Sequence, residues 1–91
     1  MKLVLCEGLT DRRFLRGFLE NQGCQWAGRV NRIHQESDDY QFKAPSAEEV
    51  LIRPIHGGFE KQVSRLRNVV KDPDRQPSQV FFVVDLDDND P

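Results

Sequence analysis

Four acidic residues lie in two short segments near opposite ends of the 91-residue chain. Glu7 and Asp11 belong to "LVLCEGLTDRRFL", and Asp85 and Asp87 belong to "VFFVVDLDDND". Mg²⁺ is a hard cation that proteins bind through one or two carboxylates together with phosphate groups of a substrate. A second metal about 4 Å away would also clamp the attacking and leaving oxygens of a phosphodiester. The two segments therefore predict a magnesium site, if the fold brings them together.

Three apolar runs predict the strands that would carry these carboxylates. Residues 2–6, 49–55 and 79–84 read "KLVLC", "EVLIRPI" and "QVFFVV", and each run ends at polar or turn-forming residues. The last run is apolar without alternation, which is typical of a parallel strand that is buried on both faces. We therefore expect it to be a central strand of the sheet.

Two segments with apolar residues at helical spacing predict helices between these strands. The first follows Thr10, a suitable N-cap, and ends at the residues before Gly23; the second covers residues 59–71. The apolar stripe of the first helix consists of Phe14, Leu15, Phe18 and Leu19. Three arginines of the same helix are expected to lie away from this stripe: Arg12, Arg13 and Arg16.

The alternation of strands and helices predicts one three-layer, Rossmann-like α/β domain over residues 1–91, with a parallel sheet of at least three strands flanked by helices. If these strands point the same way, Glu7, His56 and Asp85 follow their carboxyl ends and lie at one edge of the sheet, where open parallel sheets bind ligands. Residues 24–47 show weaker patterning, and we expect an irregular insertion there. A hairpin with arms "RVNRI" and "YQFK" is the alternative.

The two acidic segments together resemble the conserved motifs of Toprim domains. "LVLCEGLTDRRFL" looks like the first motif, an apolar strand followed by Glu-Gly and a helix, and "VFFVVDLDDND" looks like the second, an apolar strand that ends in Asp-x-Asp. The Asp four residues after the Glu resembles the OLD-type nucleases and related small Toprim proteins. The middle segment "IRPIHGGFEKQVSRL" also fits, with a glycine turn between strand and helix. The region of the insertion is unmatched.

This resemblance implies metal-dependent phosphoryl transfer on nucleic acid, with Mg²⁺ or Mn²⁺ as the cofactor and DNA or RNA as the partner. Carried over by position, Glu7 would be the general acid/base or first metal ligand, and Asp11 the additional ligand of the OLD-like variant. Asp85 and Asp87 would be the metal-binding pair. The chain departs from the family at Asn89, where many relatives have a third acid. It also stops at Pro91, before the last strand and helix of the family, so we expect a fragment or a reduced domain.

Other interpretations of the acidic end remain open. Asp85, Asp87 and Asn89 match three positions of a calcium-binding EF-hand loop, but Asp90 stands in place of the required Gly and a strand precedes the loop. A solvated acidic end without any site is a further alternative. A receiver-like signalling domain would need an acidic pair directly after the first strand, which "CEGLTD" does not provide. A non-catalytic module that binds a metal or another chain through an exposed sheet edge is the main rival function.

Basic and glycine residues are the weaker candidates for contacts with nucleic acid. Arg12, Arg13 and Arg16 could follow a phosphate backbone, or they could form a solvated helix face. The segment His56-Gly57-Gly58 could contact or cradle a phosphate, although a turn explains it equally well. Trp26 could stack on a base, but we favour a role in anchoring the insertion.

The composition limits the class of protein. Hydrophobic residues make up 37% and charged residues 31%, and no apolar run approaches the roughly 20 residues of a membrane helix. The start "MKLVLCEG" is too short for the apolar region of a signal peptide, so we expect a cytoplasmic protein that does not interact with membranes. Cys6 and Cys24 are expected to be reduced thiols. The net charge of −2 neither requires nor excludes a nucleic-acid partner.

Overall fold

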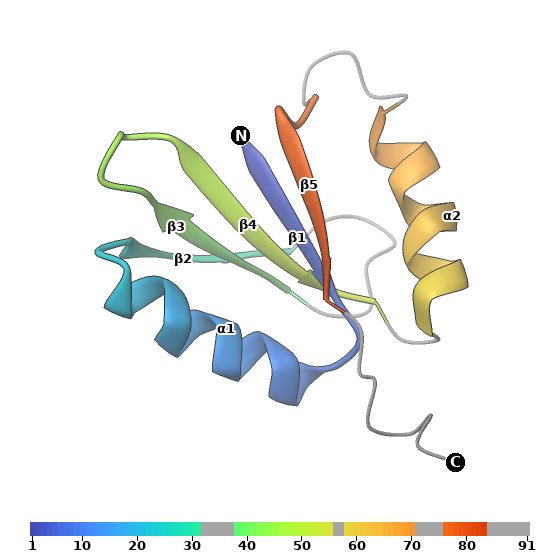
Figure 1. Cartoon of the computed structure of the whole chain (residues 1–91), viewed down its shortest axis with the longest axis horizontal. Helices are drawn as coiled ribbons and strands as arrows, with labels where there is room; N and C mark the ends of the chain where they lie inside the picture. The colour runs from blue at the N-terminus through green and yellow to red at the C-terminus, as the bar shows by residue number, and fades with distance from the viewer. Residues whose placement is uncertain (32–37, 56–57, 71–75, 84–91) are drawn as a thin grey trace.

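The computed structural model describes residues 1–31, 38–55, 58–70 and 76–83, in which five strands form one mixed sheet with a helix on each side (Figure 1). In chain order the elements are β1 (Lys2–Cys6), α1 (Leu9–Asn21), β2 (Gln25–Val30), β3 (Asp39–Lys43), β4 (Glu49–Pro54), α2 (Gly58–Val70) and β5 (Gln79–Val83). The strand order in the sheet is β2-β3-β4-β1-β5. Neither described helix is long and apolar enough to cross a membrane.

The parallel part of the sheet is centred on β1. This strand pairs in parallel with β4 on one side and with β5 on the other, so that Leu5 lies between Arg53 and Phe82. The prediction of an α/β fold with at least three parallel strands is therefore confirmed. A prediction that is wrong concerns β5, which is an edge strand of the described sheet with Phe81 47% exposed. The apolar run predicted burial on both faces, but the connectivity gives the central position to β1.

The region from 24 to 47 is more regular than we expected. Its described residues include β2 and β3, which pair antiparallel with each other, and β3 pairs antiparallel with β4. The hairpin alternative is thus closer than the irregular insertion, although its first arm begins at Gln25 rather than Arg29. The alternation was hidden by a β-bulge between Trp26 and Gly28, where Gly28 has a φ of 116°.

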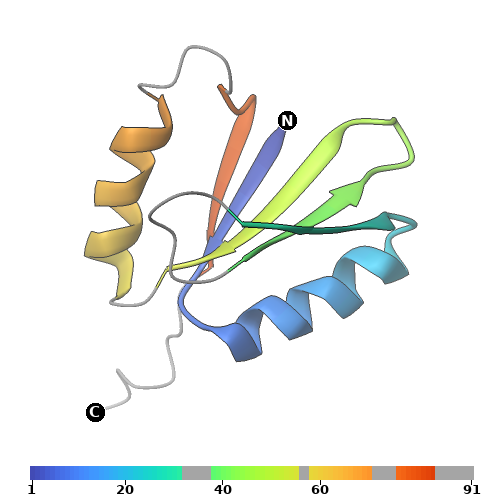
Figure 2. The same cartoon turned by 180° about the vertical axis from the view of Figure 1, so that it is seen from behind.

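Two apolar clusters lie on the two faces of the sheet. On the α1 side, alternate strand residues such as Val4, Phe42 and Ile52 pack with Leu15 and Leu19 of the helix. On the other side, where Figure 2 shows α2, the buried residues are Leu3, Leu5, Leu51 and Ile55. Side chains of β1 and β4 alternate between the two faces of the sheet and are buried on both, so these two strands form the core.

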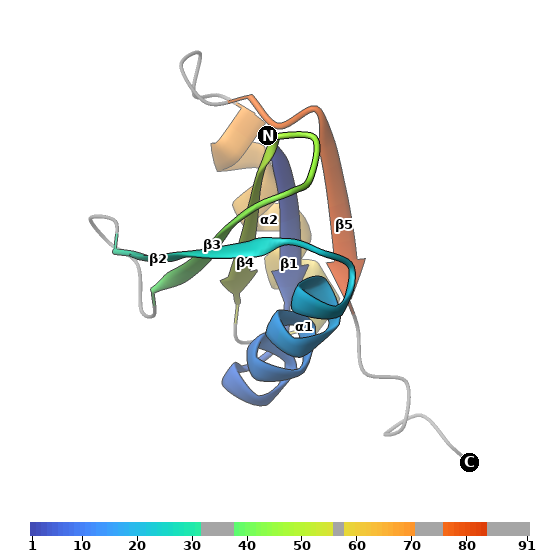
Figure 3. The ribbon, with the colours of Figure 1, turned by 90° about the vertical axis from the view of Figure 1, so that its left-hand side faces the viewer.

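Helix α1 is oriented differently from the sequence prediction. It begins at Leu9 with Gly8 as the N-cap, without a side-chain capping bond, so Thr10 is not the cap. Only half of the predicted stripe faces the core, because Phe14 is 74% exposed and Phe18 is 52% exposed. Arg12, expected on the outer surface, is buried. The helix packs mainly on β4, β2 and β3 (Figures 1 and 3), and Phe14 and Phe18 lie outside this contact.

Candidate acidic metal site

The carboxyl ends of β1, β4 and β5 meet at one edge of the sheet. Cys6 is the last residue of β1 in register with both Pro54 and Val83. The backbone N–H of Ile55 also donates to the carbonyl oxygen of Cys6 at 2.6 Å. The residue after Cys6 is Glu7, and Asp85 comes two residues after Val83. The chain therefore leaves adjacent parallel strands at neighbouring points with acidic residues immediately following.

Glu7 and Asp11 lie on either side of the turn that joins β1 to α1. Glu7 is partly buried, and Asp11 is partly buried in the first turn of α1. Burial raises the pKa of the Cys6 thiol, at the end of β1, from 9.0 to about 12, and the negative charge of Asp11 contributes to the same increase.

The remaining predicted ligands lie outside the described residues. This holds for Asp85, Asp87, His56 and Gly57, whereas Gly58 is the first residue of α2. Within the described part of the chain, no group of three or more His, Cys, Asp or Glu side chains could hold a metal ion. The metal-binding pair therefore remains a prediction that depends on the register of β5.

Gln62 of α2 is a residue at this edge that the sequence analysis missed. Its side chain is fully buried, and its Nε2 donates to the carbonyl oxygen of Val83 at 3.3 Å. Its Oε1 is also buried and has no hydrogen-bond partner among the described residues. The signal in the sequence was its position three residues after Phe59, on the side of the helix expected to be apolar. Gln62 holds the end of β5 just before the acidic segment.

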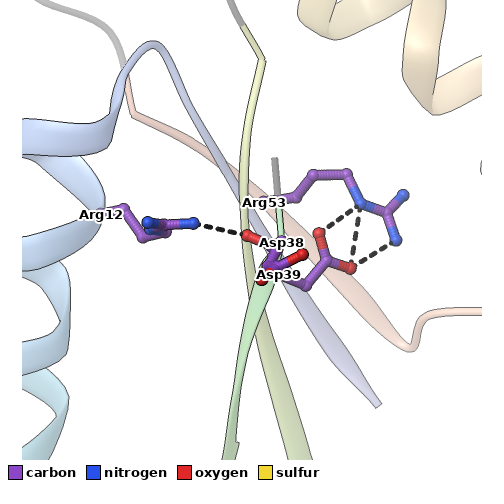
Figure 4. Close-up of polar contacts among 4 residues, drawn as sticks. All are labelled: Arg12, Asp38, Asp39 and Arg53. Atoms are coloured by element: carbon purple, nitrogen blue, oxygen red, sulfur yellow. Dashed lines mark hydrogen bonds and ion pairs between the residues drawn. The ribbon is translucent and has the colours of Figure 1, made fainter. Parts of the chain in front are cut away.

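Two arginines hold the start of β3 from opposite sides of the sheet (Figure 4). From α1, Nη1 of Arg12 donates to the carbonyl oxygen of Asp38 at 2.6 Å. From β4, Arg53 forms a bidentate pair with the fully buried Asp39, with Nη2 to Oδ2 at 2.8 Å and Nε to Oδ1 at 3.0 Å. Arg12 also lies 4.0 Å from the centre of the Tyr40 ring. Its contacts are structural, and its burial contradicts the predicted role in a solvated or phosphate-binding face.

The other two predicted arginines are accessible. Arg13 is exposed on α1, and Arg16 stacks on Trp26 with 4.0 Å from its guanidinium carbon to the ring centre. Trp26 in turn packs edge-on against Tyr40 at 4.9 Å and Phe42 at 5.3 Å, which fits its expected role as an anchor.

Comparison with protein-family models, with curated proteins and with solved structures returned no match.

Proposed function

We propose that this chain is a metal-dependent phosphoryl-transfer domain of the Toprim type, which cleaves phosphodiester bonds of DNA or RNA with Mg²⁺ or Mn²⁺. The observation that supports it is the parallel pairing of β1 with β5, in which Cys6 and Val83 are the last partners. In this register Glu7 and Asp85 follow neighbouring strand ends, where open α/β sheets bind ligands.

In this proposal the carboxylates divide the chemistry between them. Asp85 and Asp87 hold the cation, Asp11 adds a ligand from the first turn of α1, and Glu7 is a ligand or the general acid/base. These are hard oxygen donors, and a magnesium ion held by few protein carboxylates keeps coordination positions for substrate phosphate. The metal would neutralise the charge that develops on the phosphoryl oxygens. Gln62 holds the end of β5, which the acidic segment follows in the sequence.

The test replaces the proposed ligands by their amides. Glu7→Gln and Asp85→Asn should each abolish Mg²⁺- or Mn²⁺-dependent nicking of a supercoiled plasmid or cleavage of an RNA, because the amide lacks the charge that binds the cation. Glu49→Gln is the matched control, since Glu49 begins β4 at the opposite edge of the sheet, paired with Lys43. Cleavage that continues unchanged in both site variants would contradict the proposal.

A second candidate function is a non-catalytic module that assembles with another chain or with a second copy. The observation in its favour is that β5 is an edge strand of the described sheet with an exposed apolar side chain, Phe81. This function predicts Mg²⁺ binding in calorimetry and a mass above that of the monomer in light scattering, without cleavage under any metal condition.

A further inference from the structure

A cationic surface lies on the α1 side of the sheet, where the helix passes over β2. The guanidinium carbon of Arg16 lies 4.0 Å from the ring centre of Trp26, the only tryptophan of the chain, and the Nε of Arg16 donates to Glu20 at 2.9 Å. The Arg16 side chain is still 39% exposed, and among the described residues only its Nε makes a hydrogen bond. The result is a planar cation with a fixed orientation and free N–H donors.

Two more arginines extend this surface. Arg29 of β2 is exposed and lies 5.4 Å from the Tyr40 ring, on the same side as Trp26 because the bulge changes the alternation of β2. Arg13 is exposed three residues before Arg16 on α1. Within the described part of the chain neither Arg13 nor Arg29 has an ion pair. We call the set Arg13, Arg16, Arg29 and Trp26 the arginine platform.

The buried Arg12 adds positive charge beneath the platform. It has no carboxylate partner among the described residues, and its buried Nε is without a hydrogen-bond acceptor. Glu20 pairs with Arg16, and Asp38 accepts a hydrogen bond from the side-chain amide of Asn31 at 2.6 Å while it keeps its negative charge. These two carboxylates stand against the four positive charges of Arg12, Arg13, Arg16 and Arg29. The local field therefore favours an anion, although the whole chain has a net charge of −2.

The platform is close to the acidic edge. Arg29 is in register with Tyr40, Tyr40 with Ile52, and Ile52 with Val4. Glu7 comes three residues after Val4, so strand spacings of about 4.8 Å and a rise of about 3.3 Å per residue place the two positions about 17 Å apart. One strand of nucleic acid could span this distance with a few nucleotides.

We propose that the arginine platform binds single-stranded nucleic acid and leads it to the acidic edge; its use in catalysis, though not the binding itself, rests on the proposed function. Arg13 and Arg29 contact phosphates, and a base stacks on the outer face of the Arg16 guanidinium. Unpaired bases stack on guanidinium planes and aromatic rings, whereas the faces of bases in a duplex are covered by their neighbours. The stacked pair of Arg16 and Trp26 therefore selects single strands over duplexes.

Trp26 fluorescence provides the assay, with a single-stranded oligonucleotide of about ten nucleotides titrated in EDTA so that no metal site contributes. Binding should change the Trp26 emission, and two phosphate contacts should give a slope of log K against log salt of about −1.4. Arg13→Gln and Arg29→Gln should each make this slope shallower by about 0.7. Arg16→Gln should weaken binding about tenfold, since it removes the stacking surface.

Arg65→Gln and Arg67→Gln are the matched controls, because these exposed arginines belong to α2 on the other side of the sheet. They should leave the affinity unchanged. Equal affinity for a duplex, unaltered binding by Arg16→Gln, or equal losses in the controls would each overturn the inference. Metal-dependent cleavage without single-strand binding would refute the platform alone, whereas platform binding with unaffected cleavage in Glu7→Gln and Asp85→Asn would refute the proposed function alone.

Discussion

The two outer strands of the described sheet, β2 and β5, differ in how they are protected from pairing with other chains. β2 carries a bulge at Gly28 and the charged Arg29, and it lies beside the arginine-bearing flank of α1. β5 reads "QVFFV", with no charge, glycine or proline, and its Phe81 is exposed. Bulges and charges are devices that prevent edge strands from pairing with other chains. One edge is thus built to stay unpaired and to attract anions, and the other is suited to contact with apolar surface or another strand.

The largest effect on stability should come from the buried ion pair between Asp39 of β3 and Arg53 of β4, on the β2 side of the sheet. Asp39→Asn leaves Arg53 buried without its counter-charge, so we expect the free energy of unfolding to fall by about 3–5 kcal/mol. Urea denaturation measures the change. Glu20→Gln, which breaks the exposed pair with Arg16, should cost no more than about 0.5 kcal/mol. Equal losses in both variants would show that the Asp39 pair is not an anchor.

The β-bulge of β2 can be tested by substituting Gly28, with a smaller expected effect on stability. Gly28 has a φ of 116°, which side chains disfavour, so Gly28→Ala should lower the free energy of unfolding by about 1–3 kcal/mol. Gly17→Ala is the control, because Gly17 lies in the exposed part of α1 with no atom near the added methyl group, and it should be neutral or stabilising by up to about 1 kcal/mol. Identical effects of the two substitutions would contradict the strain at Gly28.

The parallel part of the sheet can be tested through the pH dependence of stability that the Cys6 thiol causes, because Cys6 is in register with Val83 of β5. Its pKa is raised from 9.0 to about 12, so the native state retains the proton that the unfolded state loses. The stabilisation is complete below about pH 9 and is lost as the pH rises toward 12, by up to about 1.4 kcal/mol per pH unit. Urea titrations at pH 8 to 10 should show a steeper loss than in Cys6→Ala. The same dependence of stability on pH in the wild type and in Cys6→Ala would contradict the raised pKa of the Cys6 thiol.

The smallest effect on stability should be at the β5 edge. Phe81→Lys alters an exposed side chain, so the free energy of unfolding should change by only about 0.5 kcal/mol. If the edge mediates self-association, light scattering over a range of concentrations should show that the variant dissociates to the monomer. Arg29→Lys, at the other edge, should leave the mass unchanged. If the wild-type chain is a monomer, the proposed assembly through β5 is wrong. The two outer strands then differ only in their surface chemistry.

The sequence predicted those features that depend on local patterns. The strands around Leu3, Leu51 and Val80, both helices within about two residues, and the position of Glu7 after β1 follow from apolar runs and turn residues. The orientation of α1 could not be predicted, because four apolar residues and three arginines fit more than one helix face. The choice of Leu15 and Arg12 for the interior depends on Tyr40 of β3 and on Asp38, the residue before β3, which both contact Arg12.

The candidate site was predictable to a lesser extent. Sequence order alone could not show that β5 pairs with β1 rather than with β4, and this pairing is what places Glu7 beside the strand that leads to Asp85. Gln62 was missed because a polar residue near an apolar stripe looks like a surface residue. The platform was missed because the bulge breaks the alternation that would have assigned Trp26 and Arg29 to one side.

The central position of β1 has a consequence for how the protein folds. Its residues 2–6 pair with partners near residues 50 and 80, and the hydroxyl of Ser78 donates to the carbonyl oxygen of Met1 across a separation of 77 residues. Contacts of such long range slow folding, since the chain must close large loops before the contacts form. During synthesis β1 leaves the ribosome well before its partner β5 is made, while the local antiparallel pair of β3 and β4 can form earlier.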